Sequence, residues 1–321
     1  MAELPALQAL FKSVNFYGRF ALSFTRVGYI ARGLPLLPVR ADYGGQTWLI
    51  TGATGGLGKA ATLKAVAKGA TVHAVGRNLQ ALDALVAETA RMPGKVVPVV
   101  CDLSSMAAVA AMARRPDIAA VQYDVLVNNV GLLMREFEPT AEGFETSYAT
   151  NLLGHYILTE QLQAQGRLKP GAAVINVVSG GLYNVPLNKS MLNIPQEKFN
   201  GFAACASHKR AQLALTEHWR AAFSDRGIKT YAVHPGWADT AGVKMSLPRF
   251  RKVLAPILRN DAEGADTIDW LAATRPPELV DQIWFDRKPR TAHAYARTRE
   301  TRTTIADIVA YLERDRVRVL G

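Results

Sequence analysis

The stretch from Thr51 to Gly58 contains glycines at the spacing of a phosphate-binding turn. It reads Thr-Gly-Ala-Thr-Gly-Gly-Leu-Gly, and it follows an apolar run and precedes a helical one. Gly52, Gly56 and Gly58 would allow a tight turn, close approach of the backbone to a pyrophosphate, and close packing of helix on strand. The unpaired N–H groups at the helix start would face the phosphates. We therefore predict a dinucleotide site, whose turn is completed by Thr54, Gly55 and Leu57.

The residue placed to read the adenosine ribose is basic rather than acidic. An acid at the end of the second strand would accept hydrogen bonds from the ribose hydroxyls and repel a 2′-phosphate. This chain has Gly76-Arg77 there, and a guanidinium suits a phosphate. The pattern favours NADP over NAD, although Arg77 could also be an ordinary surface arginine. Asp102, at the end of the third strand and beside Leu103, is placed to meet the adenine amino group.

The elements that must position these residues alternate along the chain from Gln46 onward. Short β-rich runs alternate with longer helical ones, which is typical of βαβ units and a parallel sheet. We predict an α/β fold, a Rossmann-type doubly wound parallel sheet of about seven strands, within a single domain over 42–321. The expected strands are Thr47–Ile50, Thr71–Val75, Val96–Val100, Val125–Val127, Ala173–Val178, Thr230–Val233 and Gln282–Phe285.

Residues 1–41 form a leader outside this pattern, basic and aromatic in composition. Phe16, Phe20 and Phe24 recur every four residues, so they would share one face of a helix. Such a basic amphipathic helix could lie on an anionic membrane. The alternative is a helix packed on its own domain or on a second subunit, in a homo-oligomer. At the other end, the stretch Thr304–Arg318 predicts an amphipathic helix that packs on the domain.

The composition excludes several other classes of protein. The net charge is +11, but the basic residues are spread along the chain without a nucleic-acid-binding motif, so we predict no nucleic-acid partner. Two cysteines far apart, Cys101 and Cys205, argue against a disulfide framework or a metal site and suit a reducing compartment. No apolar run approaches the roughly 20 residues that span a bilayer. We expect a cytoplasmic protein, with any membrane contact made by the leader.

Several motifs together resemble the short-chain dehydrogenases/reductases over about residues 46–240. They are the glycine turn, Cys101-Asp102-Leu103, Asn128-Asn129-Val130-Gly131 after the fourth strand, Asn151, Ser179, Lys209, Pro235-Gly236 after the sixth strand, and Thr240. Later stretches, such as His234-Pro-Gly-Trp-Ala-Asp-Thr240 and Phe285-Asp-Arg-Lys-Pro289, are similar to the dehydrogenase/reductase member 12 subgroup. The resemblance implies that Asn129, Val130, Gly131, Pro235, Gly236 and Thr240 line the cofactor.

The resemblance also implies a catalytic set, one member of which differs here. Ser179 would hydrogen-bond the substrate oxygen, Lys209 would hold the nicotinamide ribose, and Asn151 would fix a water in a proton relay. The family's tyrosine lies four residues before the lysine, one helical turn away, so that both side chains face the nicotinamide. Here that position is Cys205.

Three interpretations of Cys205 follow. It could be an inactivating replacement in an otherwise intact enzyme; it could work as a thiol whose thiolate is favoured by Lys209; or another group could supply the proton. The candidate groups are Tyr183, His208 and Tyr156. We favour inactivation, because Ser179 and Lys209 have little reason to stay together otherwise.

Substrate choice should depend on loops beyond the carboxyl ends of the strands. The segments 180–200 and 237–262 are rich in apolar residues and include Tyr183 and Trp237. They predict an apolar carbonyl or secondary alcohol as substrate, although the same residues could serve lid packing. The predicted function is an NADP-dependent oxidoreductase that transfers hydride. The alternative is a non-catalytic NADP(H)-binding sensor or scaffold of the same origin.

Overall fold

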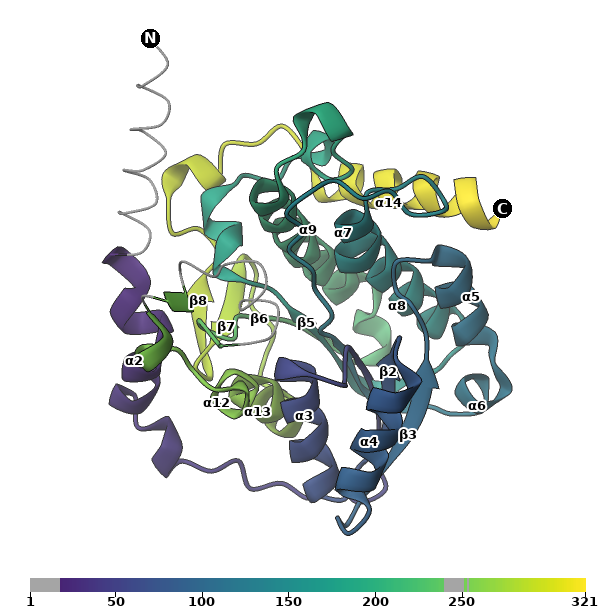
Figure 1. Ribbon diagram of the computed structural model, residues 1–321, viewed down its shortest axis with the longest axis vertical. Helices are drawn as coiled ribbons and strands as arrows, with labels where there is room; N and C mark the ends of the chain where they lie inside the picture. The colour runs from purple at the N-terminus through teal and green to yellow at the C-terminus, as the bar shows by residue number, and fades with distance from the viewer. Residues whose placement is uncertain (1–17, 240–250, 253) are drawn as a thin grey trace.

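Eight strands form one sheet in the computed structural model, which describes residues 18–239, 251–252 and 254–321 (Figure 1). Their order is β3-β2-β1-β4-β5-β6-β7-β8, parallel except that β8 runs antiparallel to β7. The direction of winding reverses between β1 and β4, where α/β folds of this type bind ligands. The strands are β1 (Thr47–Thr51), β2 (Thr71–Gly76), β3 (Lys95–Val100), β4 (Tyr123–Asn128), β5 (Leu168–Val177), β6 (Lys229–Val233), β7 (Gln282–Phe285) and β8 (Lys288–Thr291).

Helices cover both faces of the sheet because its strands are apolar on both sides. Along β1, Leu49 packs into one core, while Trp48 and Ile50 pack into the other. The first core is shared with α5, α8, α9 and α14, and the second with α3, α4 and α13. The helices are α3 (Gly56–Ala67), α4 (Leu79–Thr89), α5 (Met106–Arg114), α6 (Pro116–Ala119), α7 (Thr146–Tyr148), α8 (Gly154–Ala164), α9 (Gly201–Ala222), α12 (Asp261–Gly264), α13 (Asp266–Thr274) and α14 (Ile305–Leu320).

Strand β8 is the element that the sequence did not predict. All four of its residues are exposed, so it lacks the apolar alternation that reveals a strand, and it carries Pro289, which edge strands tolerate. It pairs with β7 through a turn made by Asp286 and Arg287, both at positive φ (50° and 58°). Positive φ at both central residues is the geometry of a type I′ hairpin turn.

The described part of the leader packs on its own domain. Residues 18–24 and α2 (Arg26–Ala31) are helical and lie beside the sheet end that carries β7 and β8 (Figure 1). Phe24 is buried and stacks with Phe20 at 4.5 Å between ring centroids, and Phe20 stacks on Tyr183 at 5.5 Å. Phe16 falls outside the described residues. Within the described part of the chain, no helix is long and apolar enough to cross a bilayer.

A buried ion pair fastens the leader to the domain. Arg259 binds both carboxylate oxygens of Asp286, at 2.6 and 2.9 Å, and both side chains are almost fully buried. The same guanidinium donates to the backbone carbonyls of Ser23 and Phe24. The described part of the leader is therefore held beside the loop that follows β6.

Candidate active site

The glycine turn has the geometry that only glycine allows. Gly52 and Gly56 have φ values of 66° and 54°. A Cβ on Gly58 would lie 2.2 Å from the carbonyl oxygen of Gly52, a separation that no side chain could tolerate. The Asn129 Nδ2 group donates to the carbonyl of Thr51 at 2.8 Å and closes the turn from the β4 side. The backbone therefore leaves an open cradle above the start of α3.

The first turn of α3 carries no competing group. Gly55 is its N-cap, no side chain caps it, and its first turn contains no acid. The N–H groups of a helix start favour an anion because they lack intrahelical acceptors and lie at the positive end of the dipole. This arrangement fits the pyrophosphate that the sequence predicts, with Leu57 and the half-buried Thr54 beside it.

The predicted adenosine-binding residues lie at the ends of β2 and β3. Arg77 is exposed, and within the described residues its guanidinium makes no hydrogen bond or ion pair. A Cβ on Gly76 would contact Thr54 Cγ2 at 3.1 Å, so the strand end packs directly on the glycine turn. One oxygen of Asp102 accepts hydrogen bonds from the N–H and hydroxyl of Ser104. Leu103 is buried beneath it.

The loop after β4 completes the cradle. The backbone N–H groups of Asn129 and Val130 donate to Thr51 Oγ1 at 2.9 and 3.1 Å. A Cβ on Gly131 would lie 3.3 Å from Lys209 Nζ, so bare backbone faces the lysine. After β6, Pro235 is buried and Gly236 has φ 77°, and its N–H donates to His234 Nδ1. Thr240 lies outside the described residues.

Asn151 and Lys209 converge from different helices. Asn151 lies in a π-helical turn, η2 (Ala149–Leu153), and such turns are frequent at functional sites. Its side chain accepts from the Leu132 N–H at 2.6 Å and donates to the Leu132 carbonyl at 2.8 Å. Lys209 Nζ donates to the Val177 carbonyl at 2.7 Å and to Gln212 Oε1 at 2.8 Å. Burial lowers the pKa of Lys209 to about 8, while Cys205 raises it.

Ser179 and α9, the helix that carries Cys205, both lie against Gly181. Ser179 Oγ accepts from the Gly181 N–H at 3.3 Å, just beyond the end of β5. A Cβ on Gly181 would touch both Ser179 Oγ (3.2 Å) and the Cβ of Ala206 (3.4 Å), which is the residue after Cys205 on α9. Burial raises the pKa of the Cys205 thiol, and the nearby Lys209 only partly offsets it. Lys209 thus favours the thiolate, but the burial of Cys205 outweighs its effect.

Each side chain considered as a substitute acid has a hydrogen-bond partner of its own. The Tyr183 hydroxyl donates to the Thr291 carbonyl in β8 at 3.1 Å, and burial raises the pKa of Tyr183 to about 12. The Tyr156 hydroxyl reaches Glu313 on α14. His208 Nε2 is 2.8 Å from the Leu192 carbonyl, and burial lowers the pKa of His208 to about 4. The two tyrosines thus bond partners outside the predicted catalytic set, whereas His208 Nδ1 also lies 3.5 Å from Asn151 Nδ2.

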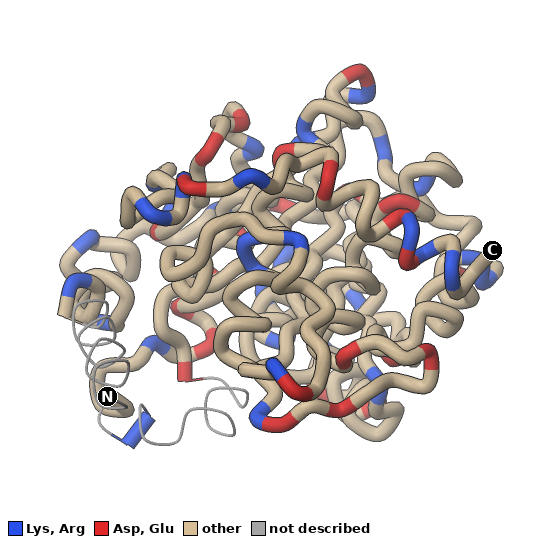
Figure 2. Tube along the Cα trace, turned by 90° about the horizontal axis from the view of Figure 1, so that it is seen from above, with Lys and Arg blue, Asp and Glu red and all other residues tan. Residues whose placement is uncertain are grey.

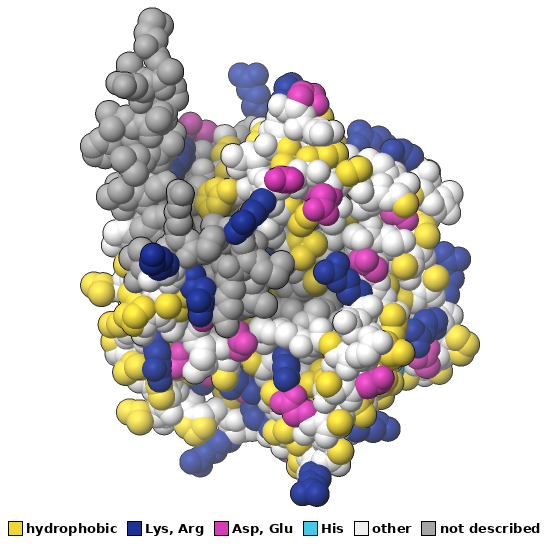
Figure 3. All heavy atoms as spheres, viewed as in Figure 1, with side chains coloured by type: hydrophobic (Ala, Val, Ile, Leu, Met, Phe, Trp, Pro, Cys, Tyr) yellow, Lys and Arg dark blue, Asp and Glu magenta, His cyan; other side chains and the backbone are white. Residues whose placement is uncertain are grey.

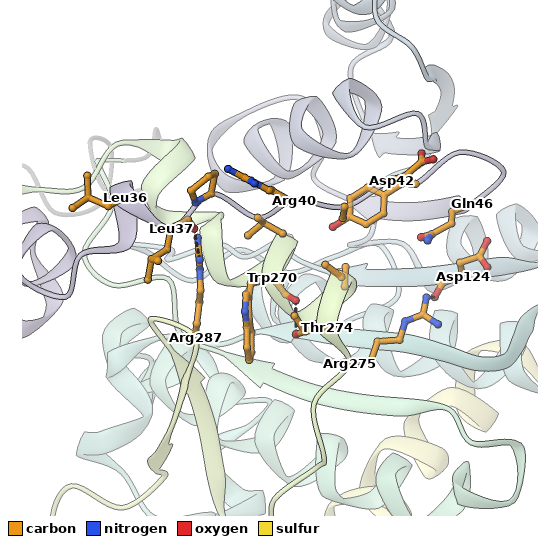
Figure 4. Close-up of a pocket in the computed structure, with 16 residues that line it drawn as sticks. Leu36, Leu37, Arg40, Asp42, Gln46, Asp124, Trp270, Thr274, Arg275 and Arg287 are labelled. Carbon is orange, nitrogen blue, oxygen red and sulfur yellow. Dashed lines mark hydrogen bonds between the residues drawn. The ribbon is translucent and has the colours of Figure 1, made fainter.

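The two predicted pocket residues both contact the leader. The ring centroids of Tyr183 and Phe24 lie 6.3 Å apart, and Trp237 meets the Phe24 ring edge-on at 5.7 Å between centroids. A separate cavity of about 930 Å³ lies between residues 36–43 and α13 (Figure 4). It is bordered by Gln46 before β1 and by Asp124 at the start of β4, so it opens at the amino ends of the strands. It is thus not the site that the glycine turn forms.

The comparison with known proteins decides the family. A model of the short chain dehydrogenase family matches residues 46–249. The chain belongs to this family. This dehydrogenase is 32% identical over 313 residues to dehydrogenase/reductase SDR family member 12 from Bos taurus. The aligned region covers 95% of this chain and 97% of the relative. The chain is 31% identical over 254 residues to retinol dehydrogenase 12 from Homo sapiens, covering 77% and 79%.

Solved structures share the fold of this dehydrogenase. An uncharacterised protein from Mycobacterium paratuberculosis has a TM-score of 0.68 at 24% identity, covering 86% of this chain and 95% of that one. A short chain dehydrogenase from Burkholderia cenocepacia J2315, solved in complex with NADP, has a TM-score of 0.60 at 20% identity, covering 73% and 92%. The predicted Rossmann-type sheet and oxidoreductase family are both confirmed.

The structure adds site residues that the sequence analysis did not name. Gln212 and His155 join the buried polar groups under Lys209, and the Thr51 hydroxyl links β1 to the loop after β4. A signal for two of them was available. Gln212 lies three residues after Lys209 and His155 four after Asn151, the spacings that bring helical side chains to one face. Among the described residues, no cluster of three or more His, Cys, Asp and Glu side chains could hold a metal.

Proposed function

We propose that this dehydrogenase transfers hydride between NADP(H) and an apolar carbonyl or secondary alcohol, with its proton step slowed by Cys205. The observation that carries the proposal is the complete setting around position 205. Ser179 lies beside Gly181, against α9, and Lys209 lies one turn along α9 from the thiol. A catalytic setting kept around a missing phenol favours an enzyme whose acid has been replaced.

The residues of the cradle fit a dinucleotide. The start of α3 packs closely on the glycine turn because Gly58 lacks a Cβ, and the exposed Arg77 is free of described partners. Arg77 would bind the 2′-phosphate, the start of α3 the pyrophosphate, and Lys209 the nicotinamide ribose. When bound, the cofactor supplies or accepts the hydride. Ser179 would hydrogen-bond the substrate oxygen and hold its carbon in place.

An apolar substrate follows from the residues around the strand ends. Leu182 and Tyr183 are buried in the cluster that also contains Phe24 and Phe285, with Trp237 packed against it. A substrate that packs beside such a buried cluster would find few hydrogen bonds and a large aromatic area, which suits a lipid-like or aromatic carbonyl better than a sugar.

The test places the family's tyrosine at position 205. Purified protein is compared with Cys205→Tyr and with Cys205→Ala in NADPH consumption against a panel of apolar ketones and aldehydes. A positioned general acid contributes about 10² to 10⁴ in rate, so Cys205→Tyr should gain by that order while Cys205→Ala does not. NADPH binding without turnover in all three forms would favour a nucleotide-binding sensor instead. Failure to bind either dinucleotide would refute both.

We also propose a peripheral membrane contact through the leader. Leu22, Val27 and Ile30 expose 75%, 45% and 52% of their surface, and residues 18–41 contain no acid. Apolar side chains gather over this part of the molecule (Figure 3). Exposed apolar residues on a basic segment suit an anionic lipid surface.

A further inference from the structure

Lys209 is a buried ammonium held by neutral groups. Lys209 is only 6% exposed, and the two hydrogen-bond acceptors of its ammonium are the Val177 carbonyl and Gln212 Oε1. Neither acceptor carries a charge, so neither offsets the desolvation of the ammonium as a carboxylate would. The position and charge of Lys209 therefore depend on how firmly these acceptors are held.

The ammonium decides which way the Gln212 amide points. An ammonium can only donate, so the atom facing it must be the amide oxygen. The amide nitrogen then faces His155 Nδ1 at 3.0 Å. That nitrogen can only donate, while the Asn151 carbonyl, 3.2 Å from the same Nδ1, can only accept, so the two contacts need opposite protonation states of Nδ1. The Gln212 contact is the shorter, and a positioning role of Gln212 requires Nδ1 to be the acceptor and to carry no proton.

The tautomer of His155 follows from this orientation. With Nδ1 unprotonated, the neutral ring carries its proton on Nε2, which lies 3.1 Å from Thr51 Oγ1. Burial, together with the nearby Lys209 charge, lowers the pKa of His155 to about 3, so the ring stays neutral. The Thr51 hydroxyl in turn accepts the N–H groups of Asn129 and Val130.

These contacts form one chain of hydrogen bonds under the cofactor cradle. It runs from Lys209 on α9, through Gln212 and His155 on α8, to Thr51 just before the glycine turn. Each member is buried, and His155 Nδ1 also meets the Asn151 carbonyl at 3.2 Å. A change of one member would thus be felt at the others.

We propose that Gln212 and His155 are positioning residues that hold the Lys209 ammonium in place for the cofactor ribose. The proposal rests on the role proposed above for Lys209. The proposal predicts opposite effects for two kinds of substitution at position 212, because the acceptor there is neutral. A carboxylate there should stabilise the ammonium, and an apolar side chain should destabilise it.

The first test follows NADPH affinity against pH by energy transfer from tryptophan to the nicotinamide. In the wild type, affinity should fall as pH rises through about 8, where Lys209 loses its proton. Gln212→Glu should move this midpoint up, and Gln212→Met should move it down, each by about one pH unit. The titratable groups coupled to Lys209 are Cys205, His208 and His155. Cys205→Ala is therefore included as a background for each variant.

A matched control shows whether the loss of any buried polar group would move the pH midpoint of NADPH affinity. Thr89→Val removes a buried hydroxyl that bonds its own helix backbone in α4, away from this chain of contacts. It should leave the midpoint unchanged. Midpoints of the two Gln212 variants that move in the same direction, or do not move, would overturn the proposal.

The second test needs no cofactor, so it separates this proposal from the proposed function. The ring nitrogens of the six histidines are followed by NMR. His155 should carry its proton on Nε2 between about pH 5 and 9, and Gln212→Glu should place a proton on Nδ1, because a carboxylate oxygen there needs a donor. An unchanged Nε2–H form in that variant would refute the positioning role. Failure of wild-type protein to bind NADPH would instead refute the cofactor proposal.

Discussion

Under the proposed function, a single side chain, Cys205, separates this chain from the catalytic pattern that the resemblance implies. The thiol of Cys205 is shorter than a phenol, and burial raises its pKa above the ordinary value. It is therefore a protonated group that falls several Å short of the place where the phenol oxygen would lie, beyond the usual reach of proton transfer of about 2.6–3.2 Å. The substitution changes reach as well as acidity, which is why restoring tyrosine is the informative experiment.

Arg77 makes cofactor preference testable at one residue. Arg77→Glu should weaken NADPH binding about 10- to 100-fold, because the 2′-phosphate loses charge-assisted hydrogen bonds and meets a like charge. NADH binding should stay the same or improve. Dissociation constants for both cofactors, measured by fluorescence, check this. Equal weakening for NADPH and NADH would mean that Arg77 does not read the phosphate.

The buried charge of Lys209 should lower the free energy of unfolding at neutral pH. Its pKa is lowered in the fold from 10.5 to about 8, so at neutral pH the folded state holds a charge that the unfolded state holds more easily. Lys209→Met should therefore be the more stable protein at pH 7, by up to about 3 kcal/mol. As pH rises from about 8 towards 10.5, the wild type loses this penalty and the gap should narrow. Urea unfolding of both at several pH values measures it, and a gap that widens with pH would contradict the assignment.

At the scale of elements, the sequence predicted the strands and helices whose apolar residues follow a regular pattern. The seven parallel strands were recognised because they are short apolar runs between helical ones, and α14 because Ile308 and Leu312 recur at helical spacing. Strand β8 was missed because its turn is Asp286-Arg287, without the glycine that usually marks a type I′ hairpin. The positive φ values there are sustained by Arg259 binding Asp286, a tertiary contact that no local pattern contains.

The leader clamp gives a prediction at the same scale. Asp286→Asn keeps a residue type that tolerates positive φ but leaves the buried Arg259 without its charge partner, so it should cost about 3–5 kcal/mol. Asp281→Asn is the matched control, because Asp281 also has positive φ (57°) but keeps 40% of its side chain exposed where it pairs with Arg299 and His293. It should cost no more than about 1 kcal/mol. Midpoints of urea unfolding at constant slope compare the two, and equal losses would show that Asp286 acts through its turn alone.

At the scale of the molecule, the sequence predicted the cofactor cradle better than its support. Gly52, Gly56 and Gly58 are dictated by backbone geometry, so their spacing is visible in one dimension. Gln212 lies at helical spacing from Lys209 in the sequence, but its contact with His155 exists only once α8 and α9 pack against each other, and no local pattern reveals it. Lys and Arg are likewise spread around the fold, interleaved with acids (Figure 2). The basic composition therefore reflects the whole surface rather than one binding face.

The leader offers the remaining test at this scale. Its inner face is held by Arg259, while Leu22, Val27 and Ile30 point outward. Insertion into a bilayer would bury them at roughly 1.5–3 kcal/mol each. The full chain should therefore float with vesicles containing anionic lipid, less so at high salt, and a Leu22→Ser/Val27→Ser/Ile30→Ser variant should lose at least tenfold in binding.

A control separates the leader from exposed apolar surface in general. Leu79 and Val280 expose 49% and 61% of their surface elsewhere on the domain, so a Leu79→Ser/Val280→Ser variant should float like the wild type. If the full chain stays in solution with anionic vesicles, the membrane contact is refuted, and the outer face of the leader needs another partner. If both variants lose binding equally, the attraction is general to the surface. Loss confined to the leader variant would place the proposed pocket residues Tyr183 and Trp237, which pack on Phe24, next to the bilayer that could deliver an apolar substrate.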